Sequence, residues 1–419
     1  MDDILLHRRE RAAAAWALRD ELVLIGSGTL IHVPGGADQT YPYMAHAEYF
    51  WLAGHETPDS VLAFDPRAGW TDFVPAVTQA ERVWEGRTES RGTPLHELGG
   101  WLAARRGRTV VGLGCDIPGL SGDAARAADL RDKLLHTRRP KDAHEIAVLR
   151  KACEATAAGY RALVSALQPG VSERDLQVEL ELAFLRAGGD RTGYGSIVGV
   201  GSNSAILHPT PGSRRTQPGD LVLVDAGAEV GRYTADVTRT YRLPGGDDSF
   251  FRSLHEVVHR VERAAIARCV PGAEWREIHL AAALEIAEGL VALGILVGAP
   301  DSLVERDTHA LFFPHGLGHM VGLGVRDASG YLPGRKRSDR PGLSMLRTDL
   351  PLEQGYVMTV EPGIYFIPAL LQDPALRERH RDAVRWDRVD TLLEFGGIRI
   401  EDDVLITDGA PEVLTAAIP

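Results

Sequence analysis

Cysteine is scarce in this chain, which contains three cysteines in 419 residues. Cys115, Cys153 and Cys269 are far apart in the sequence and form no Cys-x-x-Cys pair. Their odd number and wide spacing exclude a thiolate zinc site and a disulfide scaffold, and they fit a reducing compartment. We expect none of the three to act as a catalytic nucleophile.

Long hydrophobic runs are also lacking. No apolar stretch approaches the roughly 20 residues that are needed to cross a bilayer. The first residues, Met-Asp-Asp-Ile-Leu-Leu-His-Arg-Arg, are charged and lack the apolar core and cleavage site of a secretory signal. Hydrophobic residues make up 44% and charged residues 25%, as in ordinary globular chains. We therefore predict a folded, soluble, cytoplasmic protein with no membrane partner.

Positive charge is in deficit. Lys and Arg number 46 against 58 Asp and Glu, which gives a net charge of −12. This balance argues against nucleic acid as a partner, because binding to phosphates requires an excess of basic residues. A small-molecule or peptide chemistry is favoured instead, and part of the acidic excess could consist of metal ligands.

The length of the chain predicts more than one domain. In the first third, short β-branched or aliphatic runs alternate with segments of helical composition, which is typical of an α/β domain. The predicted strands are 21–25, 61–64 and 109–113, and the predicted helices are 8–18 and 94–105. The basic stretch 136–141 contains a proline and no apolar periodicity, so it predicts a linker. We therefore place the domains at residues 1–138 and 139–419.

The second domain has clear helix-start signals. Asp142 with Glu145, and Ser172 with Asp175, have the spacing of capping boxes at the beginning of helices. Two more helices are predicted at 250–269 and 274–293, on either side of a Pro-Gly pair. Strand-like segments fill the spaces between and after the helices: 193–200, 221–226, 233–243, 357–360 and 397–406. The fold class is therefore mixed α/β (α+β).

Four carboxylates occur at or near the ends of apolar strands. They are Asp225, Asp236, Glu361 and Glu401. Taken singly, each is more readily explained as a loop residue than as a metal ligand. Burying a charge is costly unless it is paired or bound to metal, so four such residues together indicate a common site. His319, with His315 in the same glycine-rich turn, adds a nitrogen ligand, and this set suits hard or borderline divalent metals.

The order Asp225, Asp236, His319, Glu361, Glu401 resembles the pita-bread metallopeptidases, which include methionine aminopeptidase, aminopeptidase P and prolidase. The resemblance spans roughly residues 138–415 and is strongest to the prolidases in the segments 341–348, 361–367 and 396–402. The segments 41–43 and 50–54 more weakly resemble the creatinase-type N-terminal domain of prolidase and aminopeptidase P. The resemblance thus implies a creatinase-like α/β domain followed by a pita-bread catalytic domain.

The resemblance also implies the roles of the five ligands. Asp225 would bind one metal ion through both oxygens, Asp236 and Glu401 would bridge two ions, and His319 and Glu361 would complete the second. Two divalent cations lower the pKa of a bridging water and polarise the scissile carbonyl. Glu361 would accept the proton of that water. Manganese is expected, with cobalt or zinc as alternatives, and a homodimer is implied.

Further residues are assigned from the same resemblance to the substrate or to the support of the ligands: His208, Tyr194, His315, Arg347, Arg399 and Thr238. His208 would stabilise the oxyanion, although a turn histidine before proline is the simpler alternative. Arg347 would pair with the free carboxylate of a dipeptide, for which a guanidinium is well shaped. Tyr194 could instead be a core residue, and Thr238 an ordinary strand residue.

Arg326 departs from the family pattern, which usually has a second histidine at this position. An arginine cannot release a proton near neutral pH, so it cannot shuttle one. Three explanations are open: the proton shuttle is dispensable, turnover is reduced, or Arg326 has taken over a contact with a carboxylate or carbonyl. We expect the last of these.

The resemblance therefore implies a metal-dependent hydrolase of Xaa-Pro dipeptides. An aminopeptidase P, which would cleave longer peptides with proline in second position, is the alternative enzyme. A catalytically silent pita-bread binding protein is the alternative from another class. Arg347 favours the dipeptidase, because a carboxylate anchor would block longer substrates on the product side.

Overall fold

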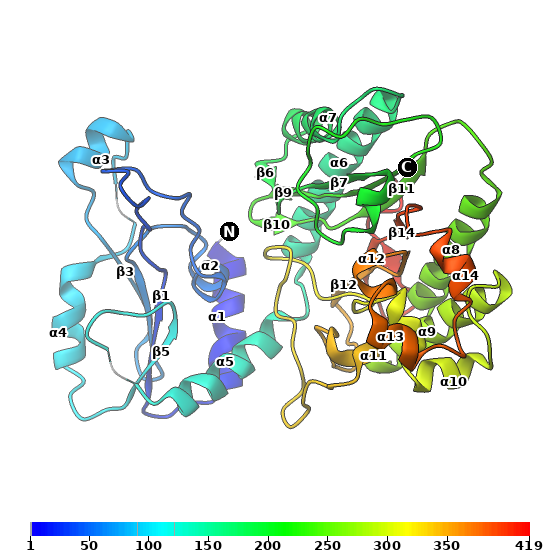
Figure 1. Cartoon of the computed structure of the whole chain (residues 1–419). Helices are drawn as coiled ribbons and strands as arrows, with labels where there is room; N and C mark the ends of the chain where they lie inside the picture. Colours follow the sequence, from blue (N-terminus) through cyan, green and yellow to red (C-terminus); the bar gives the residue numbers. More distant parts are fainter. Residues whose placement is uncertain (1, 90, 121) are drawn as a thin grey trace. The chain divides into compact units, whose positions relative to one another are not determined.

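The computed structural model describes residues 2–89, 91–120 and 122–419 (Figure 1). The chain divides after Arg138 into two compact units, Met1–Arg138 and Arg139–Pro419. Among the described residues, no helix combines the length and apolarity that a bilayer crossing requires.

The first unit contains a five-stranded sheet with the order β4-β3-β2-β1-β5. β1 pairs antiparallel with β2 and parallel with β5. Its strands are β1 (Leu22–Gly26), β2 (Val61–Asp65), β3 (Gly69–Val74), β4 (Thr93–Pro94) and β5 (Val110–Gly114), and its α-helices are α1 (Asp2–Trp16), α2 (Ala47–Ala53), α3 (Gln79–Trp84), α4 (Leu98–Ala103) and α5 (Ala124–Arg138). The predicted strands are present. The predicted helix 94–105 is shorter, because Pro94 ends β4 and a 3-10 turn, Leu95–Glu97, precedes α4.

The predicted linker 136–141 contains the division between the two units, but its residues up to Arg138 are helical. Helix α5 continues to Arg138, and the basic residues that follow are buried instead of solvated. Arg139 Nε donates to the carbonyl oxygen of Ala328 at 3.0 Å, and Lys141 Nζ lies 2.8 Å from Asp327 Oδ2. The basic composition therefore marks buried ion pairs and hydrogen bonds within the second unit.

Both predicted capping boxes are confirmed in the second unit. Asp142 and Glu145 cap α6 (Ala143–Ala166), and Ser172 and Asp175 cap α7 (Glu173–Arg186). The predicted second helix pair is also present, as α8 (Ser249–Ala267) and α9 (Trp275–Ala292). Shorter helices follow: α10 (Pro300–Glu305), α11 (Pro341–Ser344), α12 (Pro368–Leu371), α13 (Pro374–Arg379) and α14 (Trp386–Asp390).

Small sheets lie between these helices, and the predicted carboxylates lie at the ends of their strands or in the connections between them. The sheets are β10-β9-β6, β11-β8-β7, β12-β15-β16 and β13-β14. The strands are β6 (Arg191–Thr192), β7 (Ile197–Val200), β8 (Leu221–Asp225), β9 (Ala228–Val230), β10 (Tyr233–Thr234), β11 (Thr238–Arg242), β12 (Val357–Val360), β13 (Gly363–Tyr365), β14 (Gly397–Arg399), β15 (Asp402–Leu405) and β16 (Glu412–Val413). The register sets Thr238 opposite Asp225, and a β-bridge joins Thr238 to Glu401. Residues from three distant segments therefore meet at one place.

Candidate active site and metal centre

A cavity of about 630 Å³ in the second unit is lined by every predicted site residue except Thr238. The predicted residues in its wall are Tyr194, His208, Asp225, Asp236, His315, His319, Arg326, Arg347, Glu361, Arg399 and Glu401. Carboxylates and arginines both line it, so the cavity offers ligands for a cation and anchors for an anion.

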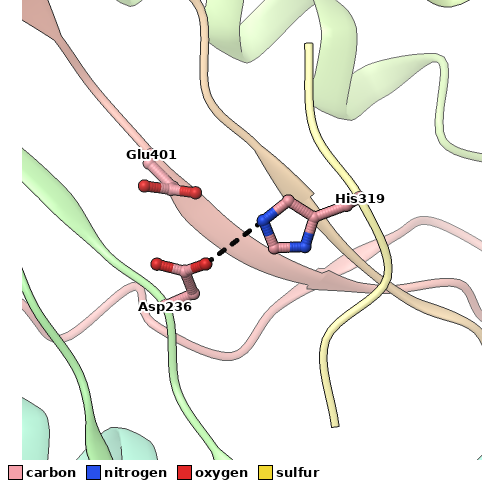
Figure 2. A group of neighbouring side chains, drawn as sticks. All are labelled: Asp236, His319 and Glu401. Atoms are coloured by element: carbon pink, nitrogen blue, oxygen red, sulfur yellow. Dashed lines mark ion pairs between the residues drawn. The ribbon is translucent and has the colours of Figure 1, made fainter. Parts of the chain in front are cut away.

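Three of the predicted metal ligands form one tight group. Asp236, His319 and Glu401 are buried, and each offers a ligand atom within 4.8 Å of the others. Figure 2 shows that these side chains converge from different segments, and His319 Nε2 lies 3.4 Å from Asp236 Oδ2. Two carboxylates with one imidazole form a donor set that divalent transition metals accept.

The protonation of His319 tests whether a cation fits this group. Its Nδ1 lies 3.1 Å from the carbonyl oxygen of Met320, which can only accept, so Nδ1 carries the hydrogen. Burial lowers the pKa of His319 to about 4, so the ring is neutral at pH 7. The lone pair of Nε2 therefore faces the oxygens of Asp236. Acceptor atoms facing one another in a buried site fit a bound cation.

The other two predicted ligands lie outside this group of three. Glu361 Oε1 is 3.9 Å from His319 Nε2. Asp225 Oδ2 instead accepts from Arg399 Nη2 at 2.7 Å, and Asp225 Oδ1 accepts from the hydroxyl of Tyr194 at 2.7 Å. The same hydroxyl lies 2.6 Å from Asp236 Oδ1, so Tyr194 joins the two aspartates.

Burial dominates the electrostatics of the carboxylates. It raises the pKa of Asp236 and of Glu401 well above the ordinary values, and the neighbouring carboxylates raise them further. Burial also raises the pKa of Glu361 to about 8, although the charge of Arg399 opposes this shift. A concentration of negative charge in a buried site is unfavourable without a compensating positive charge.

Arg399 is buried and holds several residues of the site together. Besides its ion pair with Asp225, it donates from Nη1 to the hydroxyl of Tyr365 at 2.8 Å and from Nε to Thr238 Oγ1 at 3.0 Å. Thr238 in turn donates to Glu401 Oε2 at 2.6 Å. The position of Glu401 therefore depends on Thr238, and that of Asp225 on Arg399.

Tyr365 is a residue of the site that the sequence did not single out. Its hydroxyl lies 2.9 Å from His315 Nε2, and His315 Nδ1 lies 2.9 Å from the carbonyl oxygen of Gly316. Both ring nitrogens of His315 are thus engaged by protein atoms. The available signal was the strand alternation after Glu361, which places Tyr365 on the same face of β13 as residue 363.

The cationic wall of the cavity contains Arg326 and Arg347, and the imidazole of His208 also lines the cavity. Nη1 of Arg347 is buried and has no hydrogen-bond partner among the residues that the structure describes. Arg326 is exposed and forms no ion pair within the described part of the chain. Desolvation lowers the pKa of His208, and the charge of Arg399 adds to this shift. Two guanidinium groups are thus available to a ligand in the cavity.

Comparisons with known proteins cover nearly the whole chain. The Xaa-Pro dipeptidase of Stenotrophomonas maltophilia (strain R551-3) is 33% identical over 438 residues, covering 99% of this chain and 95% of the relative. The human Xaa-Pro dipeptidase is 30% identical over 427 residues, covering 93% of this chain and 87% of the human protein. Aminopeptidase PepP from Pseudomonas aeruginosa has a similar structure, with a TM-score of 0.79, 28% identity and coverage of 99% and 95%. Proline aminopeptidase P II from Yersinia pestis is also similar in structure, with a TM-score of 0.80 and 27% identity. The match covers 100% of this chain and 97% of the Yersinia chain.

Family models match both parts of the chain. Residues 6–94 match the N-terminal domain of aminopeptidase P, and residues 147–408 match metallopeptidase family M24. The predicted fold, an N-terminal domain of the aminopeptidase P type followed by a pita-bread domain, is confirmed. Membership of this family also implies divalent metal ions, which the buried group of Asp236, His319 and Glu401 could hold. The chain belongs to metallopeptidase family M24.

Proposed function

We propose that this chain is a metal-dependent dipeptidase that hydrolyses Xaa-Pro dipeptides. The names of relatives that match over nearly its whole length support this activity. The observation that carries the substrate class is Arg347, which lines the cavity of the metal-ligand group and whose Nη1 has no hydrogen-bond partner among the described residues. A free carboxylate is the group that best satisfies such a nitrogen.

Two divalent cations would be held by the predicted ligands Asp225, Asp236, His319, Glu361 and Glu401. Manganese is the proposed metal, with cobalt or zinc as alternatives, because all three accept oxygen and imidazole ligands. When bound, such a pair makes a nucleophile from water near neutral pH and polarises the scissile carbonyl.

The residues of the chain orient the reacting groups and move the proton. The carboxylate of Glu361 accepts the proton of the attacking water and passes it to the leaving nitrogen of proline. His208 donates a hydrogen bond to the oxyanion of the tetrahedral intermediate. Tyr194 and Arg399 fix Asp225, and Thr238 fixes Glu401, through the hydrogen bonds described above.

The carboxylate of proline binds at the cationic wall. Arg347 supplies the main anchor, and Arg326 adds a second guanidinium where the family usually has a histidine. Because an arginine keeps its proton, Arg326 contributes charge and hydrogen bonds but no proton transfer. His315, whose ring nitrogens are both engaged, contributes the shape of the substrate pocket.

A second candidate is an aminopeptidase that acts on longer peptides with proline in second position, and the names of the two solved structures favour it. The test compares alanyl-proline with alanyl-prolyl-alanine at equal concentration. A dipeptidase cleaves the first faster, and an aminopeptidase P cleaves the second faster. A silent binding protein cleaves neither in the presence of manganese.

We also propose that the protein is cytoplasmic and that it forms a homodimer, the latter because it resembles the prolidases. Light scattering on the purified chain measures its mass in solution and tests the dimer.

A further inference from the structure

His279 joins two loops of the site without lining the cavity. It lies on α9, and its side chain is buried, with 1% of the residue exposed. We propose that His279 is a positioning residue that holds the loop of the metal ligand His319 in register with the segment that carries Arg347. This inference rests on the proposed function, in which His319 binds metal and Arg347 binds the substrate carboxylate.

The hydrogen bonds of His279 define its role. The backbone N–H of Leu317 donates to Nδ1 at 3.2 Å, and Nε2 lies 2.7 Å from the carbonyl oxygen of Gly342. A backbone N–H can only donate and a carbonyl can only accept, so the ring is neutral and carries its hydrogen on Nε2. Burial lowers the pKa of His279, in agreement with this state. One imidazole therefore uses both nitrogens on backbone groups 25 residues apart in the sequence.

Leu317 connects His279 directly to the chemistry. It lies midway between His315 and His319, and its carbonyl oxygen accepts from the backbone N–H of Glu361 at 2.8 Å. Leu317 therefore has its N–H fixed by His279 while its C=O fixes Glu361. A shift of Leu317 would move the histidine loop and the proton acceptor together.

Gly342 connects His279 to the substrate anchor. It belongs to α11, and Arg347 follows three residues after the end of that helix. Arg276, also on α9, forms an ion pair with Asp349, just beyond Arg347. The first turns of α9 thus hold the segment 342–349 on both sides of the anchor.

The two loops also touch each other. A Cβ atom added to Gly316 would lie 3.0 Å from the carbonyl oxygen of Met345 and 3.3 Å from the Cα atom of Leu346. With the loops this close, a displacement of one is transmitted to the other, and a single buried ring behind them is well placed to set their spacing.

Two amide substitutions separate the two hydrogen bonds of His279. In His279→Gln, the terminal NH₂ can reach the position of Nε2 and donate to Gly342, but Leu317 loses its acceptor. In His279→Asn, the shorter amide can accept from Leu317 in place of Nδ1, but Gly342 loses its donor. Each variant therefore keeps one of the two hydrogen bonds of His279 and loses the other.

The experiment measures kcat and KM for alanyl-proline and, by calorimetry, the affinity for Mn²⁺ of the metal-free protein. For His279→Gln we expect kcat and Mn²⁺ affinity to fall about tenfold with KM nearly unchanged, as for other groups that orient metal ligands. For His279→Asn we expect KM to rise about tenfold, with kcat and Mn²⁺ affinity close to those of the wild type. His380→Gln, which alters a buried histidine bonded to Thr308 outside the cavity, is the matched control and should change none of the three constants.

The proposal is overturned if both variants show the same pattern of change in kcat and KM. It is also overturned if both variants match the wild type. Should one variant not fold, the other still decides, because each is predicted to change a different constant. If the wild-type protein cleaves no dipeptide, the proposed function fails. The Mn²⁺ titrations still test His279 in that case, since only the glutamine variant should bind the metal more weakly.

Discussion

Arg399 and Asp225 form a buried ion pair, with 2.7 Å between Nη2 and Oδ2. Arg399 uses its other nitrogens on Tyr365 and Thr238, so three distant segments are fixed by one guanidinium. A lysine keeps the charge but cannot make these bonds together, because its donors share a single nitrogen.

We predict that Arg399→Lys lowers kcat for alanyl-proline by about 10- to 100-fold, the usual cost of losing a partner of metal ligands. Arg381→Lys, at an exposed position, serves as the control and should leave kcat unchanged. Wild-type kcat in the Arg399 variant would show that the geometry of the guanidinium is not required.

Arg347 is expected to recognise the free carboxylate of the substrate. Its removal in Arg347→Ala should raise KM for alanyl-proline by about 10- to 100-fold, as expected for a charged hydrogen bond, with a smaller effect on kcat. The dipeptide amide provides the control, because it lacks the carboxylate. The wild type should discriminate strongly against the amide, whereas Arg347→Ala should not. Equal discrimination by both proteins would exclude the anchor.

Arg326→His restores the residue that is usual in the family. If Arg326 anchors the carboxylate, this change should raise KM by about tenfold, through the loss of one charge-assisted contact. The new imidazole also adds a group that titrates near pH 6.5, which should appear in the pH profile of kcat. An unchanged KM for Xaa-Pro dipeptides would remove the anchoring role.

In the first unit, Asp65 lies between Arg105 and Arg108, and its oxygens are 2.7 and 2.8 Å from their nitrogens. The hydrogen bonds from Arg108 hold the pKa of Asp65 well below its usual range. A depressed pKa stabilises the folded state above the unfolded-state value of about 3.9, and this contribution is lost as the pH falls further.

We therefore predict that Asp65→Asn lowers the free energy of unfolding by about 2 kcal/mol at pH 7, because two partly buried guanidinium groups lose a carboxylate that pairs with both of them. Urea titrations of both proteins should show a constant difference above about pH 5 that shrinks below about pH 4. A difference that is the same at pH 3 and pH 7 would contradict this explanation.

Local signals predicted the fold of the second unit well. The capping boxes at Asp142 and Ser172 are sequence-local, so the starts of α6 and α7 could be read directly. The burial of the basic residues in 136–141 was not predicted, because it depends on contacts with residues far away in the sequence. Arg139 and Lys141 find partners 189 and 186 residues away, and composition alone suggests exposure for such residues.

The cavity was predictable in its members but not in their pairings. Carboxylates at the ends of apolar strands identified Asp236 and Glu401, which the sheets bring to His319. The orientation of Asp225 toward Arg399, and the link that Tyr365 makes to His315, depend on side-chain geometry across 174 and 50 residues. No periodicity in the sequence reports such contacts.

The central claim is that hydrolysis of Xaa-Pro dipeptides depends on a divalent metal held in this cavity. The most direct test removes metal with a chelator and then measures release of proline from a dipeptide panel before and after adding Mn²⁺, Co²⁺ or Zn²⁺. We predict no activity in the metal-free protein, recovery with at least one metal, and cleavage of alanyl-proline but not of alanyl-alanine. Full activity after chelation, or no Xaa-Pro hydrolysis with any metal, would contradict the claim.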